Sequence, residues 1–178
     1  MLSRPEKSEY APFYSTYIDL VPDGDLFPIL QQQIEETISL LQDTTEIQSQ
    51  FRYAPDKWSL KEVIGHIADG ERVMSYRALC IARGETQTLP GFDEKIYNQN
   101  ATFHHQSMED LLANMNIVRQ STIHLLKGLS PEVWLRRGMV IGFEITVRAL
   151  VSIIAGHELH HRQIIKERYM SSDSYPSK

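Results

Sequence analysis

Two histidines near the end of the chain have the spacing of metal ligands. They are His157 and His161, in the segment GHELHHRQIIKERY that runs from Gly156 to Tyr169. Residues four apart lie on one face of a helix, with roughly 5–6 Å between their Cβ atoms, so both imidazoles can bind one ion. Because Glu158 follows His157, the pair also has the HExxH spacing of a zinc metalloprotease. The segment therefore predicts a metal-binding helix, with a protease as one interpretation.

A third histidine, His66, has the position of a further ligand. It belongs to the apolar stripe of an earlier helical pattern, which reads Val63, His66, Ile67, Gly70 and Met74. Facing helices lie about 8–10 Å apart, a distance that imidazole side chains and a metal ion can span. The alternative is three core histidines bonded to polar neighbours, but one divalent ion satisfies three nitrogens at once. We therefore expect His66, His157 and His161 to bind a metal ion.

The other histidines are expected to take no part in this site. His160 is three residues from His157, but it and His161 cannot both point in the same direction. The remaining three are expected on the solvated surface: His104, His105 and His124.

The protease interpretation lacks a third ligand. Only Arg162 to Lys178 follow His161, without histidine or cysteine, and Ile164 replaces the glycine of the extended protease motif. A continuing helix would rotate Glu167 about 80° away from His157. Glu158 is then a flanking or supporting residue rather than a catalytic base. Asp69 and Glu158 are candidates to orient ligand imidazoles, but carboxylates on helices are usually solvated, which is the favoured alternative for both.

Four long helical patterns must position these residues. The first is expected from Asp25 to Asp43, the second from the capping box Ser59–Glu62 to Ala82, the third from Ser107 to Gly128, and the fourth from Thr146 to about Tyr169. Two connections between these helices are notable. The first is unusually long, from Arg83 to Gln106, and is expected to contain a short helix near Glu94 to Asn100. The second, Arg137 to Ile145, is expected to be irregular or weakly extended. The pattern predicts an all-α, up-down four-helix bundle, a single domain over residues 1–178 with an irregular entry segment over residues 1–24.

Composition excludes several classes of function. The net charge is −5 and no basic block exceeds the pair Arg136 and Arg137, so we expect no nucleic-acid partner. No apolar run approaches the roughly 20 residues of a membrane span, and the chain starts without a signal pattern, which predicts a cytoplasmic protein without a membrane partner. The single cysteine, Cys80, is expected in the core.

Three segments resemble the DinB-like, YfiT-like family of small bacterial proteins. They are KWSLKEV from Lys57, GHIADGE from Gly65 and GHELHHRQI from Gly156, and the resemblance covers nearly the whole chain. It implies a four-helix bundle, often a homodimer, with a divalent ion held by one histidine of the second helix and an HxxxH pair of the last. These positions are His66, His157 and His161 here. Relatives in this family include transferases and isomerases that use low-molecular-weight thiols such as bacillithiol or mycothiol, and others are described as metal-dependent hydrolases.

The expected function follows from the ligand set and this resemblance. Three imidazoles leave open positions on a zinc or nickel ion, as in a catalytic site. A thiol ionised there could attack an electrophile, which predicts a bacillithiol-like S-transferase of stress response or detoxification. A hydrolase on the same site and a non-catalytic metal or small-ligand binding bundle are the alternatives. Arg148 is a candidate contact for an anionic thiol, and Trp58 is expected to pack at the entry of the second helix.

Overall fold

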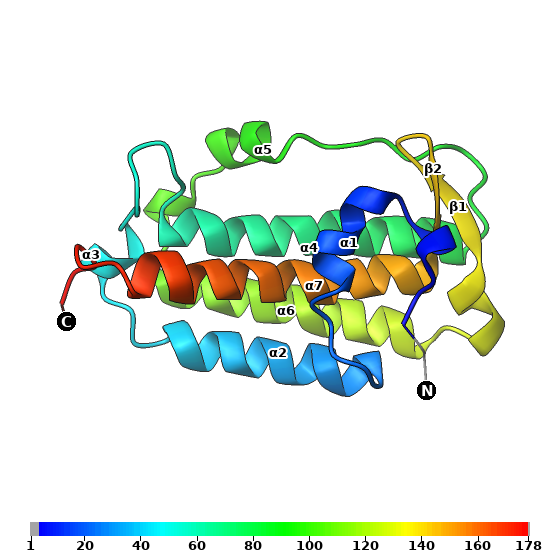
Figure 1. Ribbon diagram of the computed structural model, residues 1–178, viewed down its shortest axis with the longest axis horizontal. Helices are drawn as coiled ribbons and strands as arrows, with labels where there is room; N and C mark the ends of the chain where they lie inside the picture. The colour runs from blue at the N-terminus through cyan, green and yellow to red at the C-terminus, as the bar shows by residue number, and fades with distance from the viewer. Residues whose placement is uncertain (1–3, 178) are drawn as a thin grey trace.

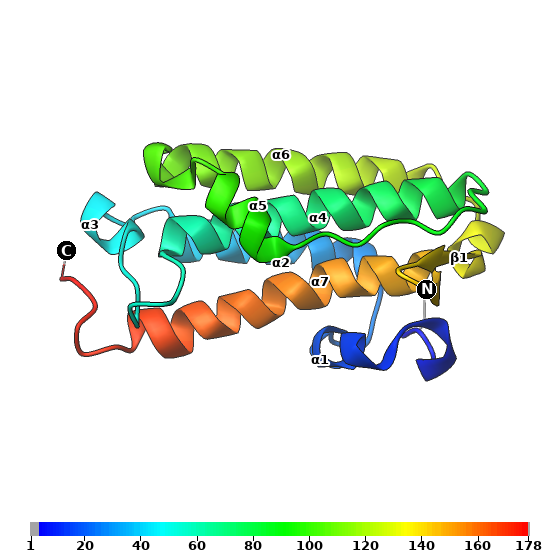
Figure 2. The ribbon, with the colours of Figure 1, turned by 90° about the horizontal axis from the view of Figure 1, so that it is seen from above.

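Four long helices form a bundle in the computed structural model, which describes residues 4–177 (Figures 1 and 2). They are α2 (Leu26–Leu41), α4 (Leu60–Ala82), α6 (Met108–Lys127) and α7 (Val147–Ile164). Helix α4 contacts α6 and α7, and α2 contacts the same two helices from the opposite corner. This arrangement confirms the expected all-α four-helix bundle.

The order of helix directions depends on the long connection after α4. In Figure 1 this connection runs back along the whole bundle before α6 begins, so α4 and α6 point the same way. Helices α2 and α7 point the opposite way, so the four-helix bundle is present as expected, but α4 and α6 are parallel where a simple up-down order would make them antiparallel. The connection carries α5 (Glu94–Asn100), as expected, and a 3-10 turn over Phe103–His105.

Side-chain caps explain where the long helices begin. The Ser59 hydroxyl accepts from the Glu62 amide at 3.3 Å, and the Glu62 carboxylate accepts from the Ser59 amide at 2.6 Å, which is the predicted capping box. Asp25, Ser107 and Thr146 cap the other three. Each cap satisfies a backbone N–H group that the helix itself leaves free.

The segment before α7 is more regular than expected. It forms a β-hairpin of β1 (Arg137–Val140) and β2 (Phe143–Thr146), with Arg137 opposite Thr146. Ile141 and Gly142 make the two-residue turn with φ angles of 46° and 84°, a conformation unusual for a β-branched side chain such as Ile141. Leu89 of the long connection adds a parallel bridge to β1, with its amide 2.8 Å from the Met139 carbonyl. Sequence alternation over so few residues could not predict this pairing.

Short helical turns complete the chain. The entry segment, expected to be irregular, contains 3-10 turns over Lys7–Glu9 and Pro12–Tyr14 and then α1 (Ser15–Ile18); residues 1–3 lie outside the described part. A short α3 (Glu46–Ser49) follows α2, and a 3-10 turn over Pro131–Leu135 precedes the hairpin. Helix α7 ends in a π-helical turn, Ile165–Met170.

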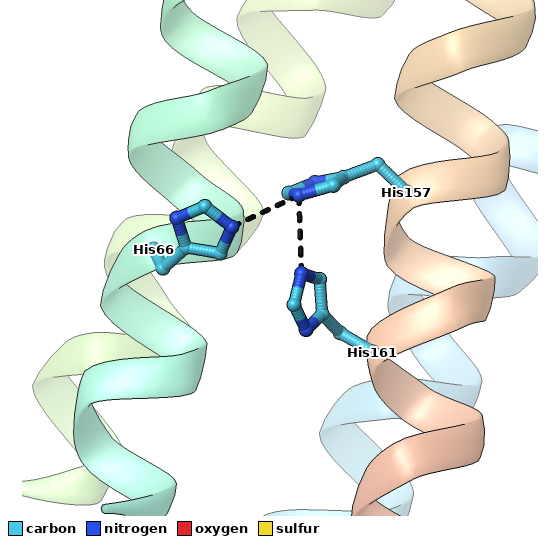
Figure 3. Close-up of side chains that lie close together, drawn as sticks. All are labelled: His66, His157 and His161. Atoms are coloured by element: carbon cyan, nitrogen blue, oxygen red, sulfur yellow. Dashed lines mark hydrogen bonds between the residues drawn. The ribbon is translucent and has the colours of Figure 1, made fainter. Parts of the chain in front are cut away.

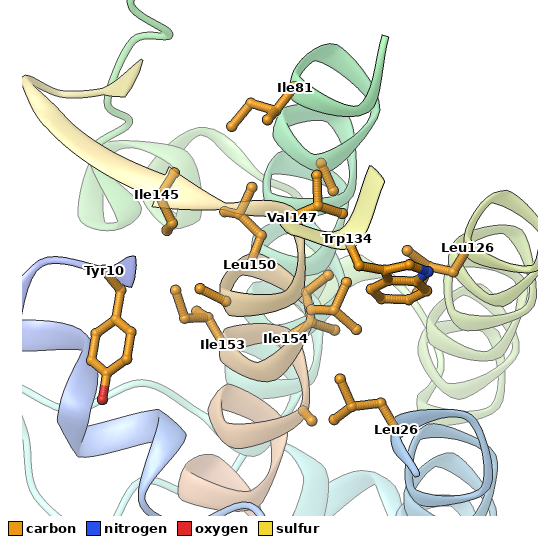
Figure 4. Packing of buried hydrophobic residues seen from close by; sticks show 14 of the residues in the cluster. Tyr10, Leu26, Ile81, Leu126, Trp134, Ile145, Val147, Leu150, Ile153 and Ile154 are labelled. Atoms are coloured by element: carbon orange, nitrogen blue, oxygen red, sulfur yellow. The ribbon is translucent and has the colours of Figure 1, made fainter. Parts of the chain in front are cut away.

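Helix α7 lies at the centre of the packing (Figure 4). Its residues Leu150, Ile153 and Ile154 are at most 3% exposed and form a core with Trp134 and Leu126. Gly156 allows α1 to reach the α7 backbone, because a Cβ atom there would lie 2.1 Å from the Tyr17 carbonyl oxygen. Helix α7 is therefore covered on several sides, which fixes the side chains that it presents to α4. None of the helices in the part described here is long and apolar enough to cross a membrane.

Candidate metal centre

The three predicted histidines meet between α4 and α7. Figure 3 shows His66 from α4 pointing toward His157 and His161 from α7. The Nε2 atom of His157 lies 3.0 Å from Nε2 of His66 and 3.1 Å from Nε2 of His161. All three ligand atoms fall within 4.8 Å of one another. The structure thus brings together the histidines that periodicity had selected.

The donor atoms fit a metal ion. In a tetrahedral site with bonds of 2.0–2.1 Å, two nitrogens lie about 3.3 Å apart, close to the two distances around His157. Burial lowers the pKa of His66 to about 4 and that of His161 to about 3, and it also lowers the pKa of His157. The rings are therefore neutral at pH 7, and three converging nitrogen lone pairs are better satisfied by one cation than by each other.

Neighbouring groups hold the rings in place. The Trp58 ring lies 4.7 Å from the His66 ring, and the Tyr17 ring meets the His157 ring edge-on at 5.3 Å. Gly70, one turn after His66, leaves space for His157, because a Cβ atom there would lie 3.0 Å from its Cε1 atom. Trp58 therefore packs as expected, and it also contacts the ring of His66, a candidate metal ligand. The sequence did not reveal this contact.

Glu158 belongs to a buried ion-pair network on the other side of α7. Its carboxylate accepts from Arg119 at 2.7 Å and from the Thr37 hydroxyl at 2.5 Å, and it is fully buried. Arg119 also binds Glu71 through Nε and Nη2, at 2.9 and 2.8 Å. Two carboxylates thus face one guanidinium. Because the Glu158 carboxylate accepts from Thr37 and Arg119, it accepts no hydrogen bond from a ligand ring, which was the orienting contact considered for it.

The other two polar candidates lie away from the rings. Asp69 is half-buried and pairs with Arg72 at 3.4 Å. Arg148 pairs with the buried Glu9, whose carboxylate accepts from Arg148 Nε at 2.7 Å and from Thr146 at 2.8 Å. Arg148 therefore ties the entry segment to the start of α7 rather than lining the pocket described below.

The other side chains that the sequence singled out lie outside the three-histidine group. His160 lies beside Tyr17, outside the three-nitrogen group, as expected. Glu167 is exposed and accepts from Gln163 at 2.8 Å, so it does not complete a protease site. Cys80 is only partly buried. His104, His105 and His124 are exposed, as expected.

A pocket of about 250 Å³ adjoins the histidines. His66 and His157 line it, together with mainly apolar and aromatic side chains of the entry segment, α4, α7 and the hairpin tip. Its lining includes Tyr17, Met74, Phe92 and Ile153. The volume is slightly below the range of about 300–1,000 Å³ that is usual for sites of drug-sized ligands, so the pocket suits a small molecule.

A helical bundle in which three histidines converge, two of them lining a mainly apolar pocket, defines a class of small helical proteins with a candidate metal centre. Residues 29–165 match the family model of the DinB superfamily, and the chain belongs to this family. The resemblance seen in the sequence is confirmed.

Individual relatives agree with this assignment. The chain is 25% identical over 146 residues to "Putative metal-dependent hydrolase OB0413" of Oceanobacillus iheyensis, covering 75% of this chain and 76% of that protein. YfiT from Bacillus subtilis, described as "a probable metal-dependent hydrolase with an unusual four-helix bundle topology", superposes with a TM-score of 0.69 at 19% identity, over 92% of this chain and 89% of YfiT. The DinB-like protein YjoA from Bacillus subtilis superposes with a TM-score of 0.58 at 19% identity, over 86% and 96% of the two chains. The two structural matches support the fold.

Proposed function

We propose that this protein is a metal-dependent S-transferase that joins a low-molecular-weight thiol, such as bacillithiol, to small electrophiles. The observation that carries the proposal is the convergence of three neutral imidazoles, of which those of His66 and His157 also line a small, mainly apolar pocket. A zinc or nickel ion held by His66, His157 and His161 would ionise a bound thiol and so supply the nucleophile. The pocket residues hold the electrophile beside it and exclude water.

The partners of Glu158 favour a thiol over water as the nucleophile. In an HExxH hydrolase the glutamate accepts the proton of the attacking water. Here both Glu158 oxygens are engaged by Arg119 and Thr37. Sulfur transfer needs no such base once the thiol is ionised, because the thiol proton leaves to solvent. The sulfur then forms the new S–C bond while the leaving group departs with its electron pair.

A hydrolase is the second candidate, and the names of the relatives from Oceanobacillus iheyensis and Bacillus subtilis support it. The two reactions differ in what they consume. With bacillithiol and 1-chloro-2,4-dinitrobenzene, a transferase consumes one thiol for each chloride released. A hydrolase instead cleaves an ester such as 4-nitrophenyl acetate without any thiol. A protein that binds metal but turns over neither substrate would be a non-catalytic metal or small-ligand binding bundle.

The first experiment is metal content by mass spectrometry after loading with zinc or nickel. We expect about one ion per chain in the parent protein and a loss in His66→Ala, His157→Ala and His161→Ala. His160→Ala is the matched control, because this histidine lies on the same helix outside the three-nitrogen group. A parent that binds no metal, or variants that all retain it, would refute the site.

The proposal extends to assembly and location. We propose a cytoplasmic homodimer that acts in stress response or detoxification. Sedimentation velocity over a range of concentrations tests the dimer, and a purely monomeric protein at micromolar concentration would contradict it.

A further inference from the structure

Arg77 of α4 differs from the other buried cations of this protein. Among residues 4–177 the buried lysines and arginines are Lys61, Arg77, Arg119 and Arg162. Lys61 lies 2.7 Å from a carboxylate oxygen, Arg119 2.7 and 2.8 Å from two, and Arg162 2.9 Å from one. Arg77 is 3% exposed and has no carboxylate within 4.0 Å in this part of the chain. Its positive charge is thus buried without a counter-charge.

The groups around Arg77 are neutral. Nη2 donates to the Pro90 carbonyl at 2.6 Å, and Nη1 donates to the Met74 sulfur at 3.4 Å, which is a weak acceptor. The guanidinium carbon lies 5.7 Å from the centre of the Phe92 ring, and the Tyr14 phenol is a further neutral neighbour. These contacts orient the guanidinium but do not neutralise it. A buried charge is costly unless a partner of opposite sign is supplied.

The position of Arg77 suggests that a ligand supplies this partner. Arg77 lines the same pocket as His66 and His157. It follows His66 by eleven residues, which corresponds to three helical turns, about 16 Å along the axis and about 20° of rotation. The pocket thus has the histidines at one end and a cation toward the other, with Met74 of α4 between them in the sequence.

The carboxylates of this pocket do not take the place of an anionic ligand. Glu71 lines it but is held by Arg119 at 2.8 Å. Glu94 lines it from α5, is exposed to solvent, and makes no ion pair with Arg77. A single guanidinium matches one carboxylate, which it can bind through two parallel hydrogen bonds.

We propose that Arg77 binds a carboxylate of an elongated small-molecule substrate whose reactive group lies at the three histidines. This inference rests on the proposed function for the position of the reactive group. The substrate class is therefore a small molecule with a carboxylate several bonds away from its reactive group, and the pocket selects it over the uncharged analogue. Arg77 acts as a specificity-determining residue and takes no part in the chemistry.

The test compares matched probes in two forms of the full-length protein by titration calorimetry. In the metal-free form hexanoate is compared with 1-hexanol, so that the carboxylate cannot bind a metal. In the zinc-loaded form 6-mercaptohexanoate is compared with 6-mercaptohexan-1-ol. We expect each carboxylate to bind about tenfold to a hundredfold more tightly than its alcohol, as for a charge-assisted hydrogen bond. Equal affinities in both forms would overturn the inference, and this comparison requires no variant.

Variants then assign the preference to one side chain. Arg77→Gln should abolish the preference for the carboxylate and leave alcohol binding unchanged, while Arg77→Lys should retain part of it. Arg72→Gln is the matched control, because this arginine lies on the same helix, is exposed and pairs with Asp69. A preference that persists in Arg77→Gln would place the anion elsewhere and refute the proposal.

The two forms separate this inference from the proposed function. A carboxylate preference in the metal-free form alone would support the anion site and contradict thiol binding at the histidines. Tight binding of both thiols without any preference would support the thiol site and contradict the role of Arg77.

Discussion

Glu9 should make the stability of this protein depend on acid. Glu9 is 3% exposed, and its carboxylate accepts hydrogen bonds from Arg148, from Thr146 and from the backbone of Glu6. Burial alone would raise the pKa of Glu9, but these bonds and the charge of Arg148 outweigh it and lower the pKa from 4.5 to about 2. The folded state therefore holds the charged form more strongly than the unfolded chain does.

The magnitude follows from this shift. A folded pKa below the unfolded value stabilises the protein at pH values above 4.5, and the contribution is lost as pH falls toward 2. At about 1.36 kcal/mol per pKa unit, the contribution is about 3 kcal/mol at pH 7 and about 1.4 kcal/mol at pH 3. The carboxylate of Glu9 should thus account for a loss of about 2 kcal/mol between these two pH values.

Urea denaturation of the parent and of Glu9→Gln at both pH values measures this term. An amide can keep some of the hydrogen bonds, so the informative quantity is how the difference in free energy of unfolding between the parent and Glu9→Gln changes with pH. We expect this difference between the two proteins to be about 2 kcal/mol larger at pH 7 than at pH 3. Glu6→Gln is the matched control, because this glutamate lies three residues earlier and is exposed. A difference that is the same at both pH values would refute the reasoning about Glu9.

Three further predictions concern the region around the histidines. Arg119→Met should lower the free energy of unfolding by about 3–5 kcal/mol, because Glu71 and Glu158 then remain buried without a cation. In urea denaturation, changing both glutamates to glutamine as well should recover part of this loss, and no recovery would contradict the explanation. Gly70→Ala should displace the His157 ring and so weaken metal binding about tenfold, as measured by competition with a chelator. The metal-free protein should not be destabilised, because alanine favours a helix over glycine by about 1 kcal/mol. The pKa of His66 is about 4 and that of His161 about 3, so both rings stay neutral at pH 5.5. The metal content after dialysis should therefore be equal at pH 7 and pH 5.5. A loss of metal centred near pH 6.5 would mean that the ligands are exposed histidines.

Local sequence signals were sufficient for the long helices and for the histidine trio. Caps such as Ser59 and Thr146 act within three residues of themselves, so their effect on helix boundaries can be predicted without any tertiary contact. The helical period likewise places His157 and His161 on one face, and His66 on the apolar stripe of its own helix. Once two apolar stripes must face each other, the imidazoles on them are brought together.

Other features depended on contacts between distant parts of the chain. Glu158 bonds Thr37 and Arg119, which are 121 and 39 residues away, and no local pattern distinguishes such a carboxylate from a solvated one. The hairpin before α7 is held partly by Leu89, from a connection that returns along the bundle.

The sequence by itself determined the helices, their ends and the three histidines that face one another, because these follow from the helical period and from short-range capping. Only the tertiary structure decided that Glu158 joins a buried ion-pair network and that Arg77 is buried beside a pocket without a counter-charge. The physical reason is that the environment of a charge is set by the groups that fold around it, and these come from elements far away in the chain.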